Sequence, residues 1–470
     1  MSSLPIVNSF PSLEPDTELG APPRRPGTRP SAVAVASAVA LAAGFLGLIA
    51  SFFGAPMRES WVAIVGTYGL IIGGAVGGIL ARYVGTTPGI EHDNIFFSGA
   101  THRGLAGWGL GFLLTGFYVL LYWFPDYLEG GVRMLDPLAR LLSGGPASRW
   151  FMYGFFYTLA VALMGVRMVM KYRHNRYQII RTASVVFFQL GFAFLVPQFL
   201  KALDQPEFYF SYFWPLKYDY LLPSSFSYLT QHPGGWGTFM LGWGAIATFV
   251  ATPVLTYFFG KRWYCSWVCG CGGLAETLGD PFRQLSDKST RAWKIERWMI
   301  HSVLIAVAVV TGLLWINHAS EGAVFGPASQ AAKKWYGFAI GSLFSGVIGV
   351  GFYPILGSRI WCRFGCPLAA ILGIIQRFFS RFRITTNGGQ CISCGNCSTY
   401  CEMGIDVRAY AKRGANIVRA SCVGCGVCAA VCPRGVLKLE NGATHADRFD
   451  GADRPWRDLL RSLGIAERHI

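Results

Sequence analysis

The sequence is poor in charge and has no cysteine over its first half. Of its 470 residues only 14% are charged, and 25 are acidic, whereas roughly 25% of the residues in soluble proteins are charged. Together with a mean hydropathy of +0.38, this scarcity excludes an ordinary soluble domain and predicts a polytopic membrane protein. All thirteen cysteines lie after residue 260, so any thiol chemistry is confined to the C-terminal part of the chain.

The chain also lacks the residue patterns of common enzyme sites. Glycine runs such as "GLIIGGAVGG" at 69–78 have no lysine and no Ser or Thr where a phosphate-binding loop needs them. The sequence shows no Ser/His/Asp set, no pair of carboxylates and no Met-rich or His-rich tract. The small residues of the glycine run instead favour close packing between helices.

Long apolar runs predict membrane-spanning helices, each of which needs about 20 mostly apolar residues. We expect eight spans, at 32–53, 61–81, 104–124, 150–170, 182–200, 237–259, 298–316 and 336–356. Lys and Arg concentrate in one set of connections, including "KYRHNR" at 171–176, so the positive-inside rule places both termini in the cytoplasm. The net charge of +16 is thereby explained by topology, and we expect membrane lipid but no nucleic acid as a partner.

The expected fold is an all-α polytopic membrane domain of about eight transmembrane helices, followed by a small α+β domain. Two cysteine runs in this domain, "CISCGNCSTYC" and "CVGCGVCAAVCP", predict a ferredoxin domain. The expected parts are a disordered cytoplasmic tail (1–30), transmembrane helices 1–5 (31–200), an extracytoplasmic aromatic loop (201–236), transmembrane helices 6–8 (237–383), the ferredoxin domain (384–442) and a C-terminal tail (443–470). The aromatic loop is predicted to fold back onto the outer membrane interface.

Two cysteine runs near the C-terminus predict iron–sulfur clusters. "CISCGNCSTYC" and "CVGCGVCAAVCP" both have the C-x2-C-x2-C-x3-C spacing of bacterial two-cluster ferredoxins, in which the fourth cysteine ligates the other cluster. Zinc sites use paired C-x2-C knuckles, and disulfides need an oxidising compartment. We therefore expect two [4Fe-4S] clusters, one held by Cys391, Cys394, Cys397 and Cys432, the other by Cys422, Cys425, Cys428 and Cys401.

The sequence around these runs departs from the ferredoxin pattern at one position. Glu402 follows the first run, where the second run has Pro433. We expect this change to alter the turn without removing a ligand. The neighbouring segments "GIDVRAYAKRG" and "GVLKLENG" predict a short helix or loop and a short strand.

An internal repeat predicts a further thiol site. "GKRWYCSWVCG" from Gly260 aligns with "GSRIWCRFGCP" from Gly357, and each segment follows a predicted span that runs inward. A four-residue step places two thiols on one face of a helix. Two such faces would bring together four thiolates, Cys265, Cys269, Cys362 and Cys366, as the ligands of a third iron–sulfur site. Arg262, Arg359 and Arg363 are predicted to offset its negative charge.

Two membrane C-x3-C motifs followed by a two-cluster ferredoxin domain resemble the NapH/NosR/CcoG group of membrane-bound polyferredoxin-like proteins. The resemblance covers about residues 180–440 and implies a bacterial inner (cytoplasmic) membrane protein that transfers electrons. The group usually has proline after each pair, as in Cys366-Pro367, but the first pair is followed by Gly270 and Cys271. Whether Cys269 or Cys271 is a ligand therefore stays open.

Weaker signals concern other cofactors. Ser98-Gly99-Ala100-Thr101 resembles the motif that carries covalent FMN in Rnf- and Nqr-type subunits, but the predicted topology places it on the wrong side of the membrane. We therefore expect no FMN at Thr101 and a helix start capped by Ser98 or Thr101. A quinone could bind near His102 or His301, both at cytoplasmic ends of predicted spans.

These observations predict an iron–sulfur electron-transfer protein that is the electron-transfer subunit of an oxidoreductase complex. It would relay electrons between a quinone/quinol pool or membrane partner and other subunits of a redox complex or a soluble electron carrier. The alternative is a copper reductase or an assembly factor for a respiratory metalloenzyme, in which Cys271 binds a metal ion transiently.

Overall fold

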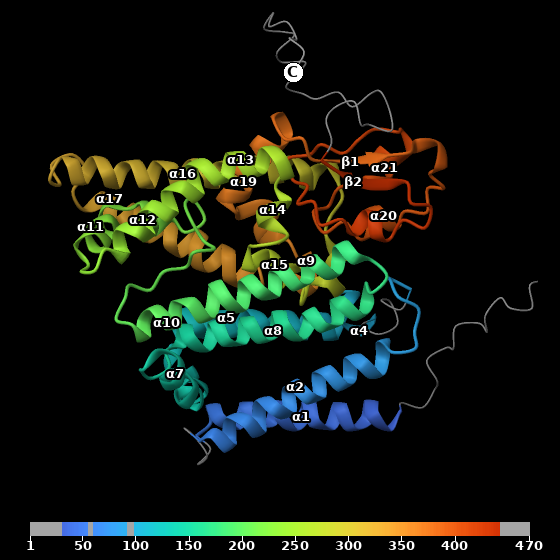
Figure 1. Ribbon diagram of the computed structural model, residues 1–470, viewed down its shortest axis with the longest axis horizontal. Coiled ribbons are helices and arrows are strands. Elements are labelled where there is room, and N and C mark those ends of the chain that lie inside the picture. The colour runs from blue at the N-terminus through green and yellow to red at the C-terminus, as the bar shows by residue number, and fades with distance from the viewer. Residues whose placement is uncertain (1–30, 55–59, 92–97, 442–470) are drawn as a thin grey trace, which may run out of the picture.

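The structure, a computed structural model of the chain, describes residues 31–54, 60–91 and 98–441. Figure 1 shows long helices running along a common direction, with the short elements of the C-terminal domain gathered at one end of them. The predicted tails at 1–30 and 443–470 lie outside the described residues.

Seven helices in the described part of the chain are long and apolar enough to cross a membrane. They are α1 (Ala32–Phe52), α2 (Trp61–Tyr83), α5 (Leu105–Trp123), α8 (Arg149–Lys171), α9 continuing into α10 (Arg176–Ala202), α12 continuing into α13 (Trp236–Phe259) and α16 (Thr290–Ala319). Each overlaps one of the predicted spans, so the all-α membrane domain is confirmed.

The eighth predicted span, at 336–356, is not a single apolar helix. α17 (Pro327–Tyr336) continues into a π-helical segment, Gly337–Ile348, and the chain then turns before α18 (Tyr353–Leu356). Lys333 and Lys334 lie in the last turn of α17, before the predicted span begins. The predicted span therefore comprises the end of α17, the π-helical segment, a turn and a short helix.

Side-chain caps determine where many of the long helices begin. Serine or asparagine oxygens accept backbone N–H groups at the first turns of α1, α2, α8, α9 and α16, the caps being Ser31, Ser60, Ser148, Asn175 and Ser289. Such caps satisfy N–H groups that have no partner within the helix. By contrast, α5 begins at Gly104 without a side-chain cap, so the prediction that Ser98 or Thr101 caps this span is wrong.

The glycine run at 69–78 packs α2 against α1, as predicted. A Cβ atom at Gly74 would lie 2.5 Å from the backbone nitrogen of Leu41 and 2.7 Å from the carbonyl oxygen of Ser37. Only glycine allows so close an approach, because any side chain would collide with the backbone of α1. The two helices form a hairpin at one edge of the molecule (Figure 1).

Shorter helices lie in the connections between the spans and in the C-terminal part of the chain. They are α4 (Ser98–Thr101), α6 (Glu129–Met134), α7 (Asp136–Ser143), α11 (Pro223–Gln231), α14 (Arg262–Cys265), α15 (Gly270–Glu276), α19 (Pro367–Phe378), α20 (Asn396–Thr399), α21 (Val407–Lys412) and α22 (Val427–Ala430). Short 3-10 turns cover Pro125–Leu128, Tyr218–Leu221 and Asp280–Leu285.

The predicted aromatic loop, 201–236, does not lie wholly at the surface. Phe208 and Phe213 are buried, and Phe213 belongs to the same hydrophobic cluster as the membrane cysteines. The Tyr264 hydroxyl donates to the carbonyl oxygen of Ser211 at 2.8 Å. Part of the loop therefore packs beneath the cysteine repeat, while Phe226 and Tyr228 remain exposed.

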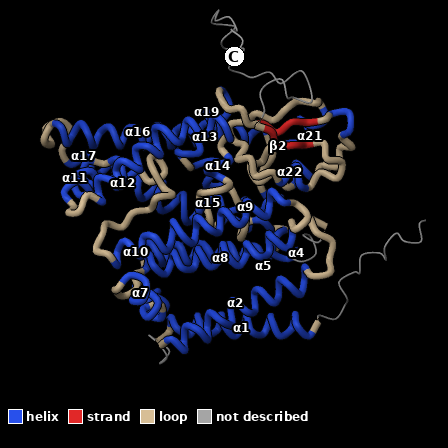
Figure 2. The backbone as a smooth tube through the Cα atoms, in the orientation of Figure 1, coloured by secondary structure: helices blue, strands red, loops and turns tan. Residues whose placement is uncertain are grey.

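The C-terminal domain is built on a pair of strands, β1 (Arg383–Thr386) and β2 (Leu437–Glu440), drawn in red in Figure 2. The strands are antiparallel, and Arg383 is paired with Glu440. These strands bracket the two cysteine runs. β2 and α21 are the short strand and short helix predicted from "GVLKLENG" and "GIDVRAYAKRG", so the α+β ferredoxin class is confirmed.

Candidate functional site

The eight cysteines of the two runs surround two separate cavities. One is lined by Cys391, Cys394, Cys397 and Cys432, and the other by Cys401, Cys422, Cys425 and Cys428. The structure thus brings together the two predicted sets, each completed by the fourth cysteine of the other run. We name them the outer set and the inner set, in that order.

The chemistry of these sets fits clusters better than single ions. Within the described ranges, no three His, Cys, Asp or Glu side chains converge closely enough to hold one metal ion. A cubane needs wider spacing, because each of its four thiolates binds a different iron atom. Burial raises the pKa values of the Cys397 and Cys422 thiols to about 11, so their ligation requires a cation that displaces the proton.

The inner set lies against the membrane domain. The Ser266 hydroxyl donates to the Val423 carbonyl at 2.8 Å, next to Cys265 on one side and Cys422 on the other. The Gln178 amide donates to the Cys425 carbonyl at 2.9 Å, and the Gln376 amide donates to the Cys422 carbonyl at 2.7 Å.

The outer set lies farther from the membrane cysteines and closer to solvent. Its Cys394 is exposed, and the neighbouring Ile392 is 59% exposed. The two sets therefore differ in position: one borders the membrane helices and the other borders the surface.

The membrane cysteine pairs do not lie on continuous helices, which corrects the sequence prediction. Cys265 ends α14, and Cys269 is the N-cap residue of α15. Likewise Cys362 lies in the π-helical turn Trp361–Gly365, and Cys366 is the N-cap residue of α19, with its sulfur accepting the Ala369 N–H at 3.4 Å. Each pair therefore spans a break between two helices.

The repeat is visible in the backbone as well as in the cysteines. The helix before each pair ends at a glycine with positive φ, Gly260 (φ +68°) after α13 and Gly357 (φ +97°) after α18. L-residues with side chains rarely adopt this conformation. The chain thus turns in the same way before each cysteine pair, and both pairs lie inside the protein.

The four membrane thiols gather in one buried region. Cys265, Cys269, Cys362 and Cys366 belong to a single hydrophobic cluster, and the Cys366 thiol lies within electrostatic range of the other three. Cys271 is partly buried, and its thiol forms a hydrogen bond with Cys269. The fifth thiol therefore stands directly beside the first pair.

Arg359 connects these thiols to two acidic residues: Glu276, which the sequence did not single out, and Glu402, which stands in place of proline after the first cysteine run. Its Nη1 donates to the Cys265 carbonyl at 3.1 Å and to the Cys362 sulfur at 3.6 Å. Its Nη2 lies 2.5 Å from a Glu276 oxygen, and its Nε lies 3.1 Å from a Glu402 oxygen.

The ion pairs continue from Arg359 into a fully buried network. Arg283 pairs with Glu402 and Asp280, both at 2.6 Å, and Asp280 also pairs with Arg167 and Lys171, both at 2.8 Å. Breaking a buried pair by removing one partner costs about 3–5 kcal/mol, because it leaves an uncompensated charge. The network therefore holds α8, the segment after α15 and the ferredoxin domain in one arrangement.

The contacts of Glu402 explain why glutamate, and not proline, follows the first cysteine run. Burial by itself would raise the pKa of this carboxyl, but the charges of Arg283 and Arg359 outweigh it, and the pKa lies below its usual value. The residue that breaks the ferredoxin pattern is thus the acid that binds the ferredoxin domain to the membrane repeat. The sequence signal that could have identified these residues was the presence of acidic side chains in segments that are otherwise apolar and poor in acids.

The other two arginines predicted to offset cluster charge have different contacts. Arg262, the repeat partner of Arg359, lies over the rings of Phe382 and Tyr177. Arg363 donates to Glu296 at 2.7 Å and to the Asp287 carbonyl at 2.7 Å. Of the three, Arg359 is the one whose guanidinium donates to a cysteine sulfur in the described part of the chain.

The residues linked to flavin and quinone lie elsewhere. Thr101 is buried at the end of α4, and its hydroxyl lies 3.4 Å from a His102 ring nitrogen. His301 lines a cavity between α16 and α19 that also reaches Cys362. Of the two histidines, His301 is therefore the one beside the membrane cysteines.

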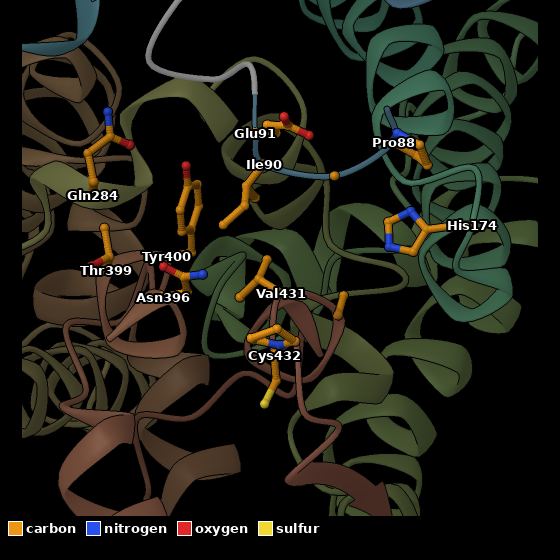
Figure 3. Close-up of a pocket in the computed structure, with 13 residues that line it drawn as sticks. Pro88, Ile90, Glu91, His174, Gln284, Asn396, Thr399, Tyr400, Val431 and Cys432 are labelled. Atoms are coloured by element: carbon orange, nitrogen blue, oxygen red, sulfur yellow. The ribbon is translucent and has the colours of Figure 1, made fainter. Parts of the chain in front are cut away.

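A larger cavity of about 540 Å³ separates the outer part of the ferredoxin domain from the membrane connections. Figure 3 shows Tyr400, Val431 and Cys432 on one side of it, with Ile90 and His174 opposite. The Cys432 sulfur points away from the cavity, toward the cysteine set of which it is a part.

Comparison with known families finds iron–sulfur domains in both halves of the site. Residues 241–289 and 338–385 each match the family described as "4Fe-4S binding domain". Residues 390–437 match the family described as "4Fe-4S dicluster domain". The double match falls on the two copies of the internal repeat.

Comparison with curated proteins finds relatives over about a third of the chain. YccM of Escherichia coli (strain K12), named for electron transport, is 29% identical over 157 residues, 31% of this chain and 43% of that protein. The methylamine utilization ferredoxin-type protein MauN of Paracoccus denitrificans is 28% identical, over 38% of this chain and 62% of that protein. MauN of Methylobacillus flagellatus is 27% identical, over 34% of this chain and 56% of that protein. The chain thus spans about half the length of these relatives. No solved structure matches it.

Proposed function

We propose that this chain, which is similar to polyferredoxin-like 4Fe-4S proteins, relays single electrons between the membrane and a protein redox partner. Its apolar helices make it a multi-pass membrane protein, and its 4Fe-4S domains make it an iron–sulfur protein. The names of YccM and MauN, which refer to electron transport and to ferredoxin, support the electron-transfer role.

The observation that carries the proposal is that cysteines of all three sites belong to one hydrophobic cluster. Ser266, next to Cys265, is hydrogen-bonded to Val423, next to Cys422, and the inner set lies between the membrane cysteines and the outer set. Clusters bound there would store and pass one electron at a time. The proposed order is membrane site, inner set, outer set and then partner.

We assign one cluster to each ferredoxin set and a third to Cys265, Cys269, Cys362 and Cys366. The burial of these four thiols in one region supports the third site. Arg359 would balance the negative charge of a thiolate-bound cluster, because its guanidinium touches a ligand sulfur and a ligand carbonyl. Cys271, hydrogen-bonded to Cys269, is the alternative ligand.

We propose a quinol as the membrane donor and a soluble carrier or another subunit as the acceptor. The packing of the membrane cysteines against Ala247 and Ile300 of the apolar helices supports a donor within the bilayer. The exposure of Cys394 supports a docking face at the outer set. We place the ferredoxin domain in the cytoplasm, on the side with the excess of Lys and Arg.

Quinol titration of the purified full-length protein tests this function. Cluster signals followed by EPR should appear as a short-chain quinol is added anaerobically. If quinol reduces no cluster and the dithionite-reduced protein instead converts Cu(II) to Cu(I), the relay is excluded and the metal-reductase alternative takes its place. The thiol pair Cys269–Cys271 is the feature that favours this alternative.

A further inference from the structure

A basic cavity of about 290 Å³ lies between α16 and α19, beside the ferredoxin domain. Trp293 and Arg297 of α16 line one side, Arg377 of α19 lines another, and Arg419 of the ferredoxin domain closes it. Three parts of the chain that are distant in sequence thus contribute cations to the same space.

The cations of this cavity have little to balance them. Among the described residues, Arg297, Arg377 and Arg419 have no hydrogen bond or ion pair from their guanidinium groups, and two of these groups lie at 5.3 Å and 4.9 Å from the Trp293 ring. The acidic residue on the lining is Glu296, which Arg363 already neutralises. Arg363 itself is buried, and its Nη2 has no hydrogen-bond partner among the described residues.

The cavity lies at the depth of the lipid head groups. Arg297 is in the polar first turns of α16, before the apolar part of that helix. Next to it, Trp298 is 79% exposed, and Phe379 at the end of α19 is 55% exposed. Aromatic side chains exposed at the end of a membrane helix mark the interface between hydrocarbon and water.

We propose that this cavity binds the phosphate of an anionic phospholipid head group. Basic pockets between membrane helices suit such head groups, and guanidinium groups bind phosphate through paired, charge-assisted hydrogen bonds. The volume is near the low end for ligand pockets, roughly 300 Å³, which suits a head group whose acyl chains stay in the bilayer. A phosphate here would stand beside Cys362, where its negative charge opposes reduction of a cluster.

The site is tested with the full-length protein in nanodiscs of phosphatidylcholine containing a minor fraction of phosphatidylglycerol. Native mass spectrometry of the released protein should show retained phosphatidylglycerol in preference to phosphatidylcholine. In the double variant Arg297→Gln, Arg419→Gln we expect the binding of phosphatidylglycerol to weaken roughly tenfold or more, because charge-assisted hydrogen bonds to its phosphate are lost. Arg291→Gln is the matched control, because Arg291 is exposed on the same helix but does not line the cavity.

Three outcomes would overturn the assignment. The first is that the unaltered protein retains the two lipids equally. The second is that the double variant retains as much phosphatidylglycerol as the control does. The third is that millimolar inorganic phosphate displaces phosphatidylglycerol. The last would assign the cavity to free phosphate instead of lipid. The comparison of lipids on the unaltered protein decides the question even if the double variant does not fold.

Discussion

Arg359 of the second cysteine repeat and Glu402 of the ferredoxin domain form an ion pair in which both side chains are fully buried. Because Arg359 also touches the sulfur of Cys362 and the carbonyl of Cys265, one guanidinium joins both membrane cysteine pairs to the segment that follows Cys401. The relative position of the membrane site and the inner set depends on this contact.

We expect Glu402→Gln to loosen the ferredoxin domain from the membrane domain. The change leaves the buried charges of Arg283 and Arg359 without this carboxylate and should destabilise the protein by about 3–5 kcal/mol. Hydrogen exchange over residues 384–440 should rise in the variant. The control is Glu129→Gln, since Glu129 pairs with Arg133 at the surface, where ion pairs contribute about 0–1 kcal/mol. Unchanged exchange in Glu402→Gln would show that the pair does not hold the domain.

Asp280 makes a contribution to stability that should persist far into the acid range. Burial opposes its charge, but Lys171, Arg167 and Arg283 outweigh burial and hold the pKa of Asp280 well below its ordinary value. A carboxyl whose pKa is lower in the folded state than in the unfolded state stabilises the fold. Its full contribution is present above the unfolded-state pKa, about 3.9, and is lost as the pH falls through the folded-state pKa. Asp280→Asn should therefore be less stable than the unaltered protein by the same amount at pH 8 and pH 5.

This pH dependence is measured by denaturant unfolding of both proteins in the same detergent. The difference between them should narrow only below about pH 4. Asp219→Asn serves as control, because Asp219 forms a partly exposed pair with Lys217. A difference that has already vanished at pH 6 would mean that Asp280 is not held ionised by its three cations.

Iron counting separates the candidate ligands of the membrane site. With three cubanes the protein should hold about twelve irons per chain, and Cys362→Ser should reduce this to about eight. Cys271→Ser should leave about twelve if Cys269 is the ligand. An unaltered protein with only about eight irons would leave the membrane cysteines without a cubane.

Gly260 should not tolerate a side chain. Its φ of +68° is unfavourable for alanine, and a Cβ atom there would lie 2.6 Å from Phe382 and 2.7 Å from the Gln376 side chain. We expect Gly260→Ala to destabilise the fold by about 1–3 kcal/mol. Gly312→Ala is the control, since this glycine lies inside α16 with open space around its Cα. The thermal unfolding midpoint should fall in the first variant and not in the second.

Much of the architecture follows from local sequence patterns. The long helices are predicted because each apolar run is long enough to cross a bilayer by itself and needs no knowledge of its neighbours. The pairing within the ferredoxin runs is predicted for a similar reason, since the short spacing of their cysteines already determines which thiols can share a cluster. The span predicted at 336–356 is the exception, because its helical segment ends at Ile348 and the chain turns before α18.

The repeat was detectable, but its geometry was not. Aligning Gly260 with Gly357 identifies the matched cysteines, whereas a spacing of four residues fits a continuous helix as well as a break between two helices. The positive φ values of the two glycines select the break. Backbone reversals of this kind depend on what packs around them, here Phe382 and Ser286.

The sequence by itself determined the membrane helices and the iron–sulfur class of the protein, and it predicted the candidate thiols, because thiol spacing and apolar length are local properties. Tertiary structure alone decided that the inner set borders the membrane cysteines and that Arg359 joins the two. It also decided that matched arginines differ, since Arg262 stacks on aromatic rings while Arg359 pairs with Glu276 and Glu402. The reason is physical: a buried charge is stable only where opposite charges from distant segments lie beside it, and a local sequence pattern does not predict which distant segments these are.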